Sequence, residues 1–390
     1  MKNDVNEIEF SVVIPCLNEA ETLEACIVKA KKAMSDGKIK GEVVVADNGS
    51  TDGSIEIAER NGAVVAHVKN KGYGNALTGG IMATKGKYII MGDADDSYDF
   101  FDIPRFAAKI KEGYDLVQGC RLPSGGGIVS QGAMPWPHRW IGNPMFSFIT
   151  RWWFGAKIHD VNCGYRAFRK DHFLSLDQRC TGMEFAVEMI IKSCLNNAKI
   201  AEVPITLHKD GRISRRPHLR TVRDGWRTLR FMLICSPRYL FVVPGLVLIF
   251  GGLAGYFLAL PRLVLGGITF DANSLLFSSL AIICGYQSIL TAVIANIFAI
   301  TERLIPSTKR FDRFYRSINV ERGSVLGLIV MAIGLTLLGI VLWQWYRVGF
   351  GELEYLKTIR LVIPGSTLVV LGFQTVVWSF VLGMINLHRR

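Results

Sequence analysis

The sequence lacks several features that would place it in a familiar class. Its eight cysteines form no C-x-x-C pair, which disfavours both a zinc site and a disulfide framework. The first ten residues are charged and lack the apolar core of a secretory signal, so we expect the first half of the chain to stay in the cytoplasm. No charge-free run of membrane-spanning length occurs before residue 238. The N-terminal half therefore has the pattern of an ordinary globular domain.

The second half of the chain is apolar. Of the 390 residues 50% are hydrophobic, and the mean hydropathy is +0.28. The chain is long for one domain and apolar for a soluble protein. We predict a globular domain over 1–208, a basic interfacial segment over 209–237 and a membrane domain over 238–390. The four expected spans lie near 239–260, 274–300, 324–346 and 361–386.

The charge distribution predicts a membrane setting. The net charge of +12 does not indicate nucleic acid, because the basic residues gather beside the apolar runs instead of in a separate arm. Anionic lipid headgroups or a phosphate-bearing substrate are the expected partners. The loop after the second span is rich in Lys and Arg, so we expect both termini in the cytoplasm. The expected location is a bacterial or archaeal plasma membrane, and homo-oligomerisation is left open.

Strand-like apolar runs alternate with helical patterns in the first 121 residues. The runs lie at 10–15, 42–47, 63–68, 87–93 and 115–121. This alternation predicts an α/β fold with a mostly parallel sheet, whose ligands bind at the carboxyl ends of the strands. Residues 122–145, rich in Gly and Pro, are predicted to form a mobile lid. Residues 159–168 are predicted to form a polar loop.

An acidic stretch follows the fourth run. Residues 91–100 read M-G-D-A-D-D-S-Y-D-F and carry four carboxylates, which repel one another and resist burial. Residues two apart at a strand end face the same way, so Asp93 and Asp95 can reach one hard cation. An EF-hand is excluded because the glycine and the final glutamate of that loop are missing. The alternative is a polar loop in which Asp99 or Asp102 caps the next helix.

The basic segment has a helical pattern. Residues 209–230 hold eight basic residues against two acidic ones. Four arginines share one helical face: Arg220, Arg223, Arg227 and Arg230. Apolar residues form an adjoining stripe: Leu219, Val222, Trp226, Leu229 and Leu233. We predict an interfacial amphipathic helix with its arginines near lipid headgroups and its stripe in the acyl boundary. A solvated helix of the globular domain is the alternative.

Six motifs between residues 10 and 208 carry a family resemblance. They read, in order, V-I-P-C-L-N-E, V-A-D-N-G-S-T-D-G-S, N-K-G-Y-G-N-A-L, G-D-A-D-D, D-V-N-C-G-Y-R-A-F and E-V-P-I-T. In this order they resemble the family 2 glycosyltransferases of the GT-A (Rossmann-like) fold. Within that family the chain is similar to the dolichyl- or polyprenyl-phosphate sugar synthases, including members with a four-helix membrane domain. Asn48, Cys163 and Asp96 depart from the family pattern, and Asp96 weakens GDP-mannose as the donor.

The resemblance implies a role for individual residues. Four would line the base and ribose of a nucleotide sugar: Pro15, Leu17, Glu19 and Asp47. The D-x-D motif would be Asp93, Ala94 and Asp95, with Asp93 and Asp95 as ligands of Mg²⁺ or Mn²⁺. Arg121 would meet the diphosphate or the acceptor. Asp160 and Arg166 would form the acceptor side of the catalytic centre. Phosphates would be gripped by a basic cluster to which Arg166 also contributes: Arg212, Arg215 and Arg216.

The chemistry of sugar transfer fits these residue types. Negative charge grows on the departing diphosphate, and a divalent cation with arginines stabilises it. A lipid monophosphate acceptor is largely ionised at neutral pH and needs no strong base. The predicted function is an inverting transfer of a hexose from a UDP- or GDP-sugar to undecaprenyl or dolichyl phosphate at the cytoplasmic membrane face.

The sequence is less consistent with other functions. A processive membrane polysaccharide synthase would carry a Q-x-x-R-W motif and a span before the catalytic domain, and the sequence shows neither. A non-enzymatic membrane scaffold with a degenerate nucleotide-sugar domain is disfavoured by the intact D-A-D and C-G-Y-R-A motifs. A dinucleotide-binding site is disfavoured because the only G-x-G lacks a third glycine. Glu184 and Glu188, one helical turn apart, are expected on a solvated or arginine-paired face outside catalysis.

Overall fold

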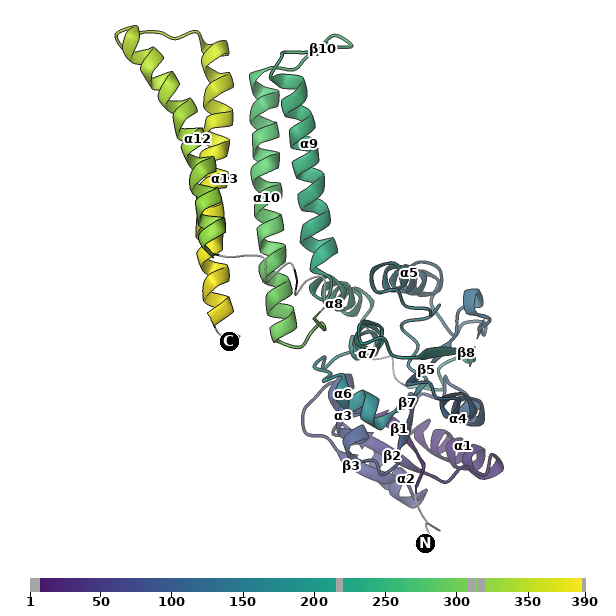
Figure 1. The fold of residues 1–390 in the computed structure, drawn as a ribbon. Coiled ribbons are helices and arrows are strands. Elements are labelled where there is room, and N and C mark those ends of the chain that lie inside the picture. Colours follow the sequence, from purple (N-terminus) through teal and green to yellow (C-terminus); the bar gives the residue numbers. More distant parts are fainter. Residues whose placement is uncertain (1–7, 215–219, 308–312, 314–319, 388–390) are drawn as a thin grey trace. The chain divides into compact units, whose positions relative to one another are not determined.

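The structure is a computed structural model that describes residues 8–214, 220–307, 313 and 320–387. The chain divides into two compact units, Met1–Met232 and Leu233–Arg390. Figure 1 shows the first unit in purple to teal and the second in green to yellow.

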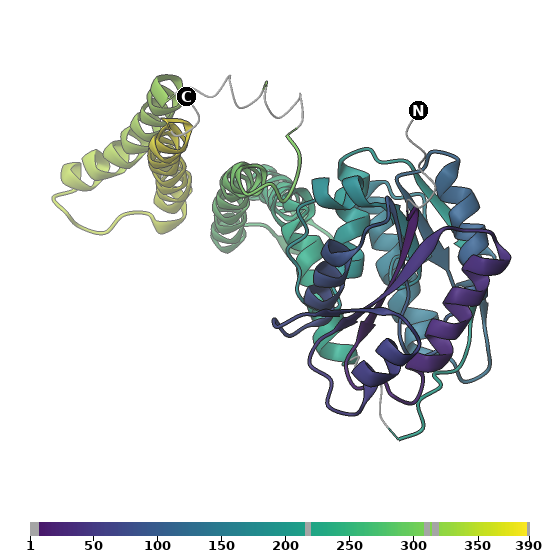
Figure 2. The same cartoon turned by 90° about the horizontal axis from the view of Figure 1, so that it is seen from below.

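The N-terminal unit is built on a seven-stranded sheet in the order β3-β2-β1-β4-β7-β5-β8. Figure 2 shows strands of this unit, in purple to teal, with helices around them. Its strands are β1 (Phe10–Cys16), β2 (Gly41–Asp47), β3 (Val64–His67), β4 (Tyr88–Met91), β5 (Leu116–Cys120), β7 (Arg166–Arg169) and β8 (Ile200–Pro204). Within the described sheet only β7 runs antiparallel to its neighbours, β4 and β5. The predicted mostly parallel α/β fold is confirmed.

Helices pack on both faces of this sheet. The helices between residues 23 and 234 are α1 (Leu23–Asp36), α2 (Ser54–Arg60), α3 (Tyr73–Ala83), α4 (Ile103–Lys111), α5 (Asn143–Phe154), α6 (Lys170–Ser175), α7 (Phe185–Leu195) and α8 (Thr221–Ile234). On β1, Val12 and Ile14 join the core that contains Leu23 of α1. On its other face β1 meets α3, where a Cβ on Gly80 would lie 2.9 Å from Cγ1 of Val13. Burial on both faces explains why the strands are continuously apolar instead of alternating.

The predicted polar loop over 159–168 is corrected by β7. Its last three residues belong to a four-residue strand that lies in the middle of the sheet. Ala167 and Phe168 are fully buried there. A strand of four residues is too short to show an alternating apolar pattern in the sequence. The arginines on either side of Ala167 and Phe168 also made the stretch look polar. The predicted lid contains β6 (Ile128–Val129), which pairs with β9 (Thr206–Leu207), and whether it moves stays a prediction.

The C-terminal unit consists of long apolar helices. They are α9 (Val243–Ala259), which the turn η4 (Arg238–Val242) precedes, α10 (Ala272–Thr301), α12 (Val320–Arg347) and α13 (Tyr355–Leu387). Four segments of the described chain are long and apolar enough to cross a membrane: Arg238–Ala259, Ala272–Thr301, Val320–Arg347 and Tyr355–Ile385. The predicted four-helix membrane domain is confirmed, so this is an integral membrane protein.

Glycines bring the helices of each membrane hairpin into backbone contact. In α9 and α10, a Cβ on Gly245 would lie 2.9 Å from the carbonyl oxygen of Gly285. In α12 and α13, a Cβ on Gly327 would lie 2.8 Å from the oxygen of Gly372, and one on Gly334 would lie 2.6 Å from that of Gly365. Small residues permit this close approach of the two backbones. The resulting van der Waals contacts stabilise the helix pair, because the hydrophobic effect does not drive helices together in lipid.

The two membrane hairpins meet through α10 and α13. Thr367 of α13 donates to Ser279 of α10 at 2.9 Å, and its hydroxyl lies 3.1 Å from that of Tyr256 on α9. Farther along, the hydroxyls of Tyr286 and Thr375 are 2.6 Å apart. Neutral hydroxyl groups thus connect the hairpins.

Candidate active site

The carboxyl ends of β1, β2 and β4 bring the predicted donor-side residues to one rim. Cys16 of β1 pairs with Asp47 of β2, and Val13 pairs with Met91, the last residue of β4. The loops that follow these strands carry Glu19 and the D-A-D motif. Strand register therefore gathers residues that lie far apart in the sequence.

Asp93 and Asp95 form an enclosed acidic pair. The Tyr73 hydroxyl donates to Oδ1 of Asp93 at 2.8 Å. Oδ1 of Asp95 accepts from the backbone N–H and the hydroxyl of Ser97, at 3.1 and 2.6 Å. Burial, and then the charge of Asp95, raise the pKa of Asp93 to about 6. Burial also raises the pKa of Asp95, although Ser97 opposes it. Because burial and mutual repulsion disfavour the charged forms of these two carboxyls, a cation bound between them would be favourable.

The other two carboxylates of the acidic stretch turn away from the rim. Lys29 of α1 donates to both oxygens of Asp96, at 2.7 and 2.8 Å, and Asp96 has a left-handed backbone with φ of 58°. Asp99 caps a short helical turn by accepting from the N–H of Phe101 at 2.9 Å. The expectation that Asp99 caps the following turn is confirmed. Only the alternate residues of the motif face the site.

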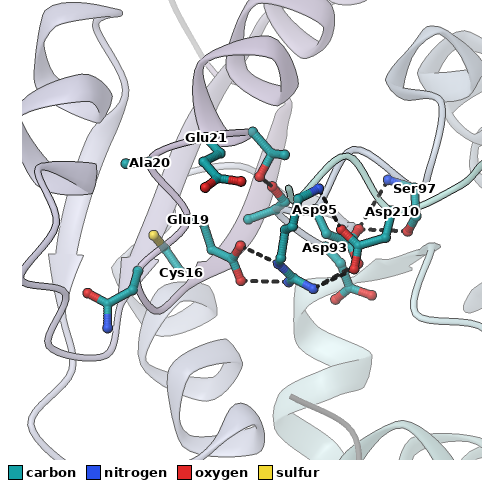
Figure 3. A network of polar contacts seen from close by, with 12 residues as sticks. Cys16, Glu19, Ala20, Glu21, Asp93, Asp95, Ser97 and Asp210 are labelled. Atoms are coloured by element: carbon teal, nitrogen blue, oxygen red, sulfur yellow. Dashed lines mark hydrogen bonds and ion pairs between the residues drawn. The ribbon is translucent and has the colours of Figure 1, made fainter. Parts of the chain in front are cut away.

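Arg212 lies between three carboxylates of the rim, those of Glu19, Asp95 and Asp210. Figure 3 labels the three carboxylates. Its Nε and Nη2 each donate to Glu19 at 2.6 Å, and its Nη1 donates to Asp210 at 2.8 Å. The same Nη1 is 3.7 Å from Oδ2 of Asp95. The Arg212 side chain is only 9% exposed. The guanidinium thus offsets negative charge beside the acidic pair. Arg215 and Arg216, the other predicted phosphate ligands, lie outside the described residues.

A small cavity of about 170 Å³ adjoins Arg212. Seven residues line it: Asn18, Glu19, Ala20, Glu21, Asp52, Arg212 and Ser214. Pro15 and Leu17 are half-buried just before it, and Ala94 is buried with its carbonyl accepting from Thr22 at 2.6 Å. Of the predicted base-and-ribose residues, Glu19 therefore lines the cavity and Leu17 belongs to the same loop, whereas Pro15 lies in β1 and Asp47 ends β2.

Asp47 is bonded to its own loop. Its oxygens accept from the N–H groups of Gly49 at 3.0 Å and Ser50 at 2.9 Å, and the residue is 3% exposed. Burial by itself would raise the pKa of this carboxyl, but the bonds from Ser50 and Gly49 outweigh it and lower the pKa. Asp47 shapes the loop that borders the site.

Asp160 and Arg166, predicted on the acceptor side, are both fully buried. Asp160 accepts from Nε and Nη2 of Arg121 at 2.7 and 2.9 Å. Arg166 donates to the backbone carbonyls of Ala186 at 2.8 Å and Cys163 at 2.5 Å. The structure places neither where an acceptor could touch it. Asp160 instead positions Arg121, which is itself 9% exposed.

Glu188 stabilises a loop beside the site, a role that the sequence did not reveal. It is fully buried and ion-paired with Lys192 at 2.8 Å, which corrects the expectation of a solvated or arginine-paired face. Glu188 also accepts from the N–H groups of Arg179 at 3.0 Å and Cys180 at 2.8 Å. The next residue, Thr181, accepts from the N–H of Gly74 at 2.9 Å. This loop therefore packs on the start of α3, which carries Tyr73 and so orients Asp93.

The donor set fits a divalent cation that is shared with a substrate. Among the residues that the structure describes, no three His, Cys, Asp or Glu side chains gather into a metal cage. Mg²⁺, however, is usually bound through one or two carboxylates together with substrate phosphates and water. Asp93 and Asp95 supply two such carboxylates, and because burial raises the pKa of each, a bound cation would stabilise their charged forms.

Comparisons with known proteins agree with this architecture. Residues 11–176 match the model for glycosyl transferase family 2, and residues 293–386 match that for the glycosyltransferase family 2 C-terminal transmembrane region. The low-salt glycan biosynthesis hexosyltransferase Agl6 of Haloferax volcanii is 35% identical over 380 residues, which cover 97% of this chain and 89% of that protein. A dolichyl-phosphate hexose transferase of the same organism is 31% identical over 198 residues, covering 50% of this chain and 82% of that protein.

A solved structure is also similar. Glucosyl-3-phosphoglycerate synthase from Mycobacterium tuberculosis, in complex with Mn²⁺, UDP and glucosyl-3-phosphoglycerate, matches with a TM-score of 0.46 and 22% identity, covering 58% of this chain and 79% of that one. The relative that matches nearly the whole chain, together with both family models, establishes the family. The chain belongs to glycosyltransferase family 2 and is a membrane-integral glycosyltransferase with a GT-A-like N-terminal unit.

Proposed function

We propose that this enzyme is an inverting, metal-dependent hexosyltransferase that moves a hexose from a UDP- or GDP-sugar to a polyprenyl phosphate at the cytoplasmic membrane face. The enclosed Asp93–Asp95 pair beside Arg212 carries the proposal, because it suits a cation and a diphosphate together. The four membrane helices and the similarity to a dolichyl-phosphate hexose transferase support a lipid acceptor.

On the donor side, Asp93 and Asp95 would hold Mg²⁺ or Mn²⁺. When bound, the ion would offset the charge that grows on the departing diphosphate. Arg212 would exchange one of its carboxylate partners for the diphosphate, and Glu19 would then be released toward the ribose. Pro15, Leu17 and the loop shaped by Asp47 would surround the base, as the family resemblance implies.

On the acceptor side, a phosphate oxygen of the lipid would attack the anomeric carbon. The bond from that carbon to the diphosphate breaks as the new bond forms, which inverts the configuration and releases the nucleoside diphosphate. A phosphate with a second pKa of about 6 is largely ionised at neutral pH, so no strong base is needed. Arg121, held by Asp160, would orient the acceptor phosphate, with Arg215 and Arg216 as further ligands.

A direct assay tests the proposal. The purified full chain in nanodiscs is incubated with polyprenyl phosphate and a panel of UDP- and GDP-hexoses, with Mg²⁺, with Mn²⁺ and with EDTA. We expect a lipid phosphate that carries one hexose, released nucleoside diphosphate in equal amount, an inverted anomeric configuration and no product with EDTA. Lipid with a growing sugar chain would instead support a processive synthase. No transfer from any donor would contradict the proposed function.

A further inference from the structure

Asn48, which departs from the family pattern, uses every polar atom of its side chain within the N-terminal unit. The residue directly follows β2 and is 4% exposed. Its amide nitrogen donates to the carbonyl oxygens of Val68 at 2.9 Å and Asn70 at 2.8 Å. Its amide oxygen accepts from the backbone N–H of Gly72 at 2.8 Å. Asn48 therefore holds the segment 68–72, which connects β3 to α3 and which we call the β3–α3 connection.

These three hydrogen bonds require an amide at position 48. Two carbonyl oxygens face one end of the side chain, which must donate, and an N–H group faces the other end, which must accept. The partners thus determine which terminal atom is nitrogen. An ionised aspartate only accepts, so at this position it would place a charged oxygen against the two carbonyl oxygens. The departure from the family pattern is therefore matched to the conformation of the β3–α3 connection.

A second contact holds the start of α3. The N–H of Gly74 donates to the carbonyl oxygen of Thr181 at 2.9 Å. A Cβ on Gly72 would collide with the same oxygen, and φ of Gly72 is 132°, so this position needs glycine. Tyr73 therefore lies between two backbone N–H groups that are both fixed, one by Asn48 and the other by Thr181.

The position of Tyr73 matters for the acidic pair, because its hydroxyl donates to Oδ1 of Asp93 at 2.8 Å. We propose that Asn48 is a positioning residue, which holds the start of α3 and, through Tyr73, orients Asp93 toward the cation. Groups that hydrogen-bond to a metal-binding carboxylate fix its orientation, and their loss weakens metal binding about tenfold or more. This inference rests on the metal-binding role of Asp93 in the proposed function.

Mn²⁺ binding measures this role without a sugar or an acceptor. The full chain in phosphatidylcholine nanodiscs is titrated with Mn²⁺, and the free ion is followed by electron paramagnetic resonance. We expect Asn48→Asp and Asn48→Ala to weaken binding about tenfold, because each removes the amide that holds the β3–α3 connection. An effect of Asn48→Asp alone would overturn the proposal, since the added charge would then be its cause.

The matched controls are Asn70→Asp and Asn70→Ala. Asn70 is exposed on the same connection, and its contact with Asn48 is made by its backbone oxygen, which both substitutions keep. Asn70→Asp adds the same charge as Asn48→Asp, so we expect both controls to bind Mn²⁺ like the unsubstituted chain. An equal loss of affinity in the Asn48 and Asn70 variants would contradict a specific role of the Asn48 amide.

A double-variant cycle tests the route through Tyr73. Tyr73→Phe removes the hydroxyl that reaches Asp93, so adding Asn48→Ala to it should cause no further loss of Mn²⁺ affinity. A further tenfold loss would overturn the proposal, because Asn48 would then act by another route. Unchanged Mn²⁺ affinity in the single Asn48 variants would overturn it as well.

Hydrogen exchange distinguishes positioning from a general loss of stability. In the Asn48 variants we expect faster exchange at residues 68–76 and unchanged exchange in α1 and α4. Faster exchange throughout the N-terminal unit would overturn the proposal, since Asn48 would then stabilise the whole unit. Sugar transfer is measured separately. A chain that shows the expected Mn²⁺ cycle but transfers no hexose would contradict the proposed function alone, whereas hexose transfer with no effect of Asn48 on Mn²⁺ would contradict this inference alone.

Discussion

The two units of this chain pack their interiors in opposite ways. In the N-terminal unit the fully buried side chains are large, and they include Phe10, Phe106 and Tyr165. In the C-terminal unit the helix contacts are made by glycine, whereas large residues such as Phe250 and Trp343 are 65% and 62% exposed. Water drives apolar side chains together, but lipid tails are as apolar as the side chains themselves. Large buried side chains therefore stabilise the N-terminal unit, whereas glycines that let helices approach closely stabilise the C-terminal unit.

Polar contacts differ in the same way. The N-terminal unit buries charged pairs, such as Glu188 with Lys192 and Asp160 with Arg121. The contacts between α10 and α13 that Ser279, Thr367 and Thr375 make are neutral hydroxyl bonds. A buried charge is costly as soon as its partner is removed, whereas a lost hydroxyl bond costs little. The most sensitive polar positions should then lie in the N-terminal unit.

Glu188→Gln should have the largest effect. It keeps the size of the side chain but leaves the buried Lys192 ammonium without its counter-charge, which costs about 3–5 kcal/mol. Hydrogen exchange at residues 177–195 should report this loss while exchange in the membrane helices stays unchanged. The control adds Lys192→Met, which should recover most of the protection. Native-like exchange in the single variant would show that the ion pair does not stabilise this unit.

Asp95→Asn comes next, with an effect on activity. Removing one carboxylate from the acidic pair should lower sugar transfer by at least about a hundredfold, because a bound cation is worth several kcal/mol of charge stabilisation. The matched control is Asp96→Asn, one residue away, whose side chain faces Lys29 and whose backbone conformation asparagine accepts. The rates of sugar transfer by the two variants are measured in nanodiscs. An equal loss of rate in both would contradict a metal-binding role for Asp95 that Asp96 does not share.

Gly334→Ala tests the membrane half of the comparison. Its Cβ would lie 2.6 Å from the Gly365 oxygen and 2.7 Å from the Val369 nitrogen, so α12 and α13 must separate. Overpacking of this kind costs about 1–3 kcal/mol. Gly339→Ala on the same helix is the control, because no atom lies within 4 Å of its Cβ. Thermal unfolding in detergent should distinguish the two, and equal melting would show that α12 and α13 do not pack through glycine.

Tyr73→Phe should have the smallest effect. It removes the hydrogen bond to Asp93, and losing a partner of this kind weakens metal binding about tenfold. That hydrogen bond lowers the pKa of Asp93, so its loss raises the pKa and moves the pH at which protons displace Mn²⁺ upward. Mn²⁺ titration followed by electron paramagnetic resonance at several pH values measures both changes. An unchanged Mn²⁺ affinity and pH midpoint would mean that Tyr73 does not orient Asp93.

Much of this architecture could be predicted because it depends on local patterns. Buried strands are continuously apolar, and a span needs a long charge-free run, so β1, β2 and the membrane helices were visible in the sequence. The D-A-D motif was visible because residues two apart, such as Asp93 and Asp95, share a direction at a strand end. The same alternation sets Asp96 apart, whereas Asp99 was set apart as a candidate cap of the following helical turn.

Other features depend on contacts between distant residues. Nothing in the spacing of Tyr73, Asp93 and Glu188 links them, because the fold brings together segments about 20 to 100 residues apart. Asp160 and Arg166 lie in a stretch that is polar in sequence but buried in space, since each finds a charged or backbone partner.

The register of the glycine contacts has a mechanical consequence. Gly327 and Gly334 are seven residues apart, as are Gly365 and Gly372, so the two contact points are separated by about 10 Å along each helix. A slide of α12 along α13 would push larger side chains against carbonyl groups at both points simultaneously. The two glycine contacts therefore fix the axial register of α12 against α13.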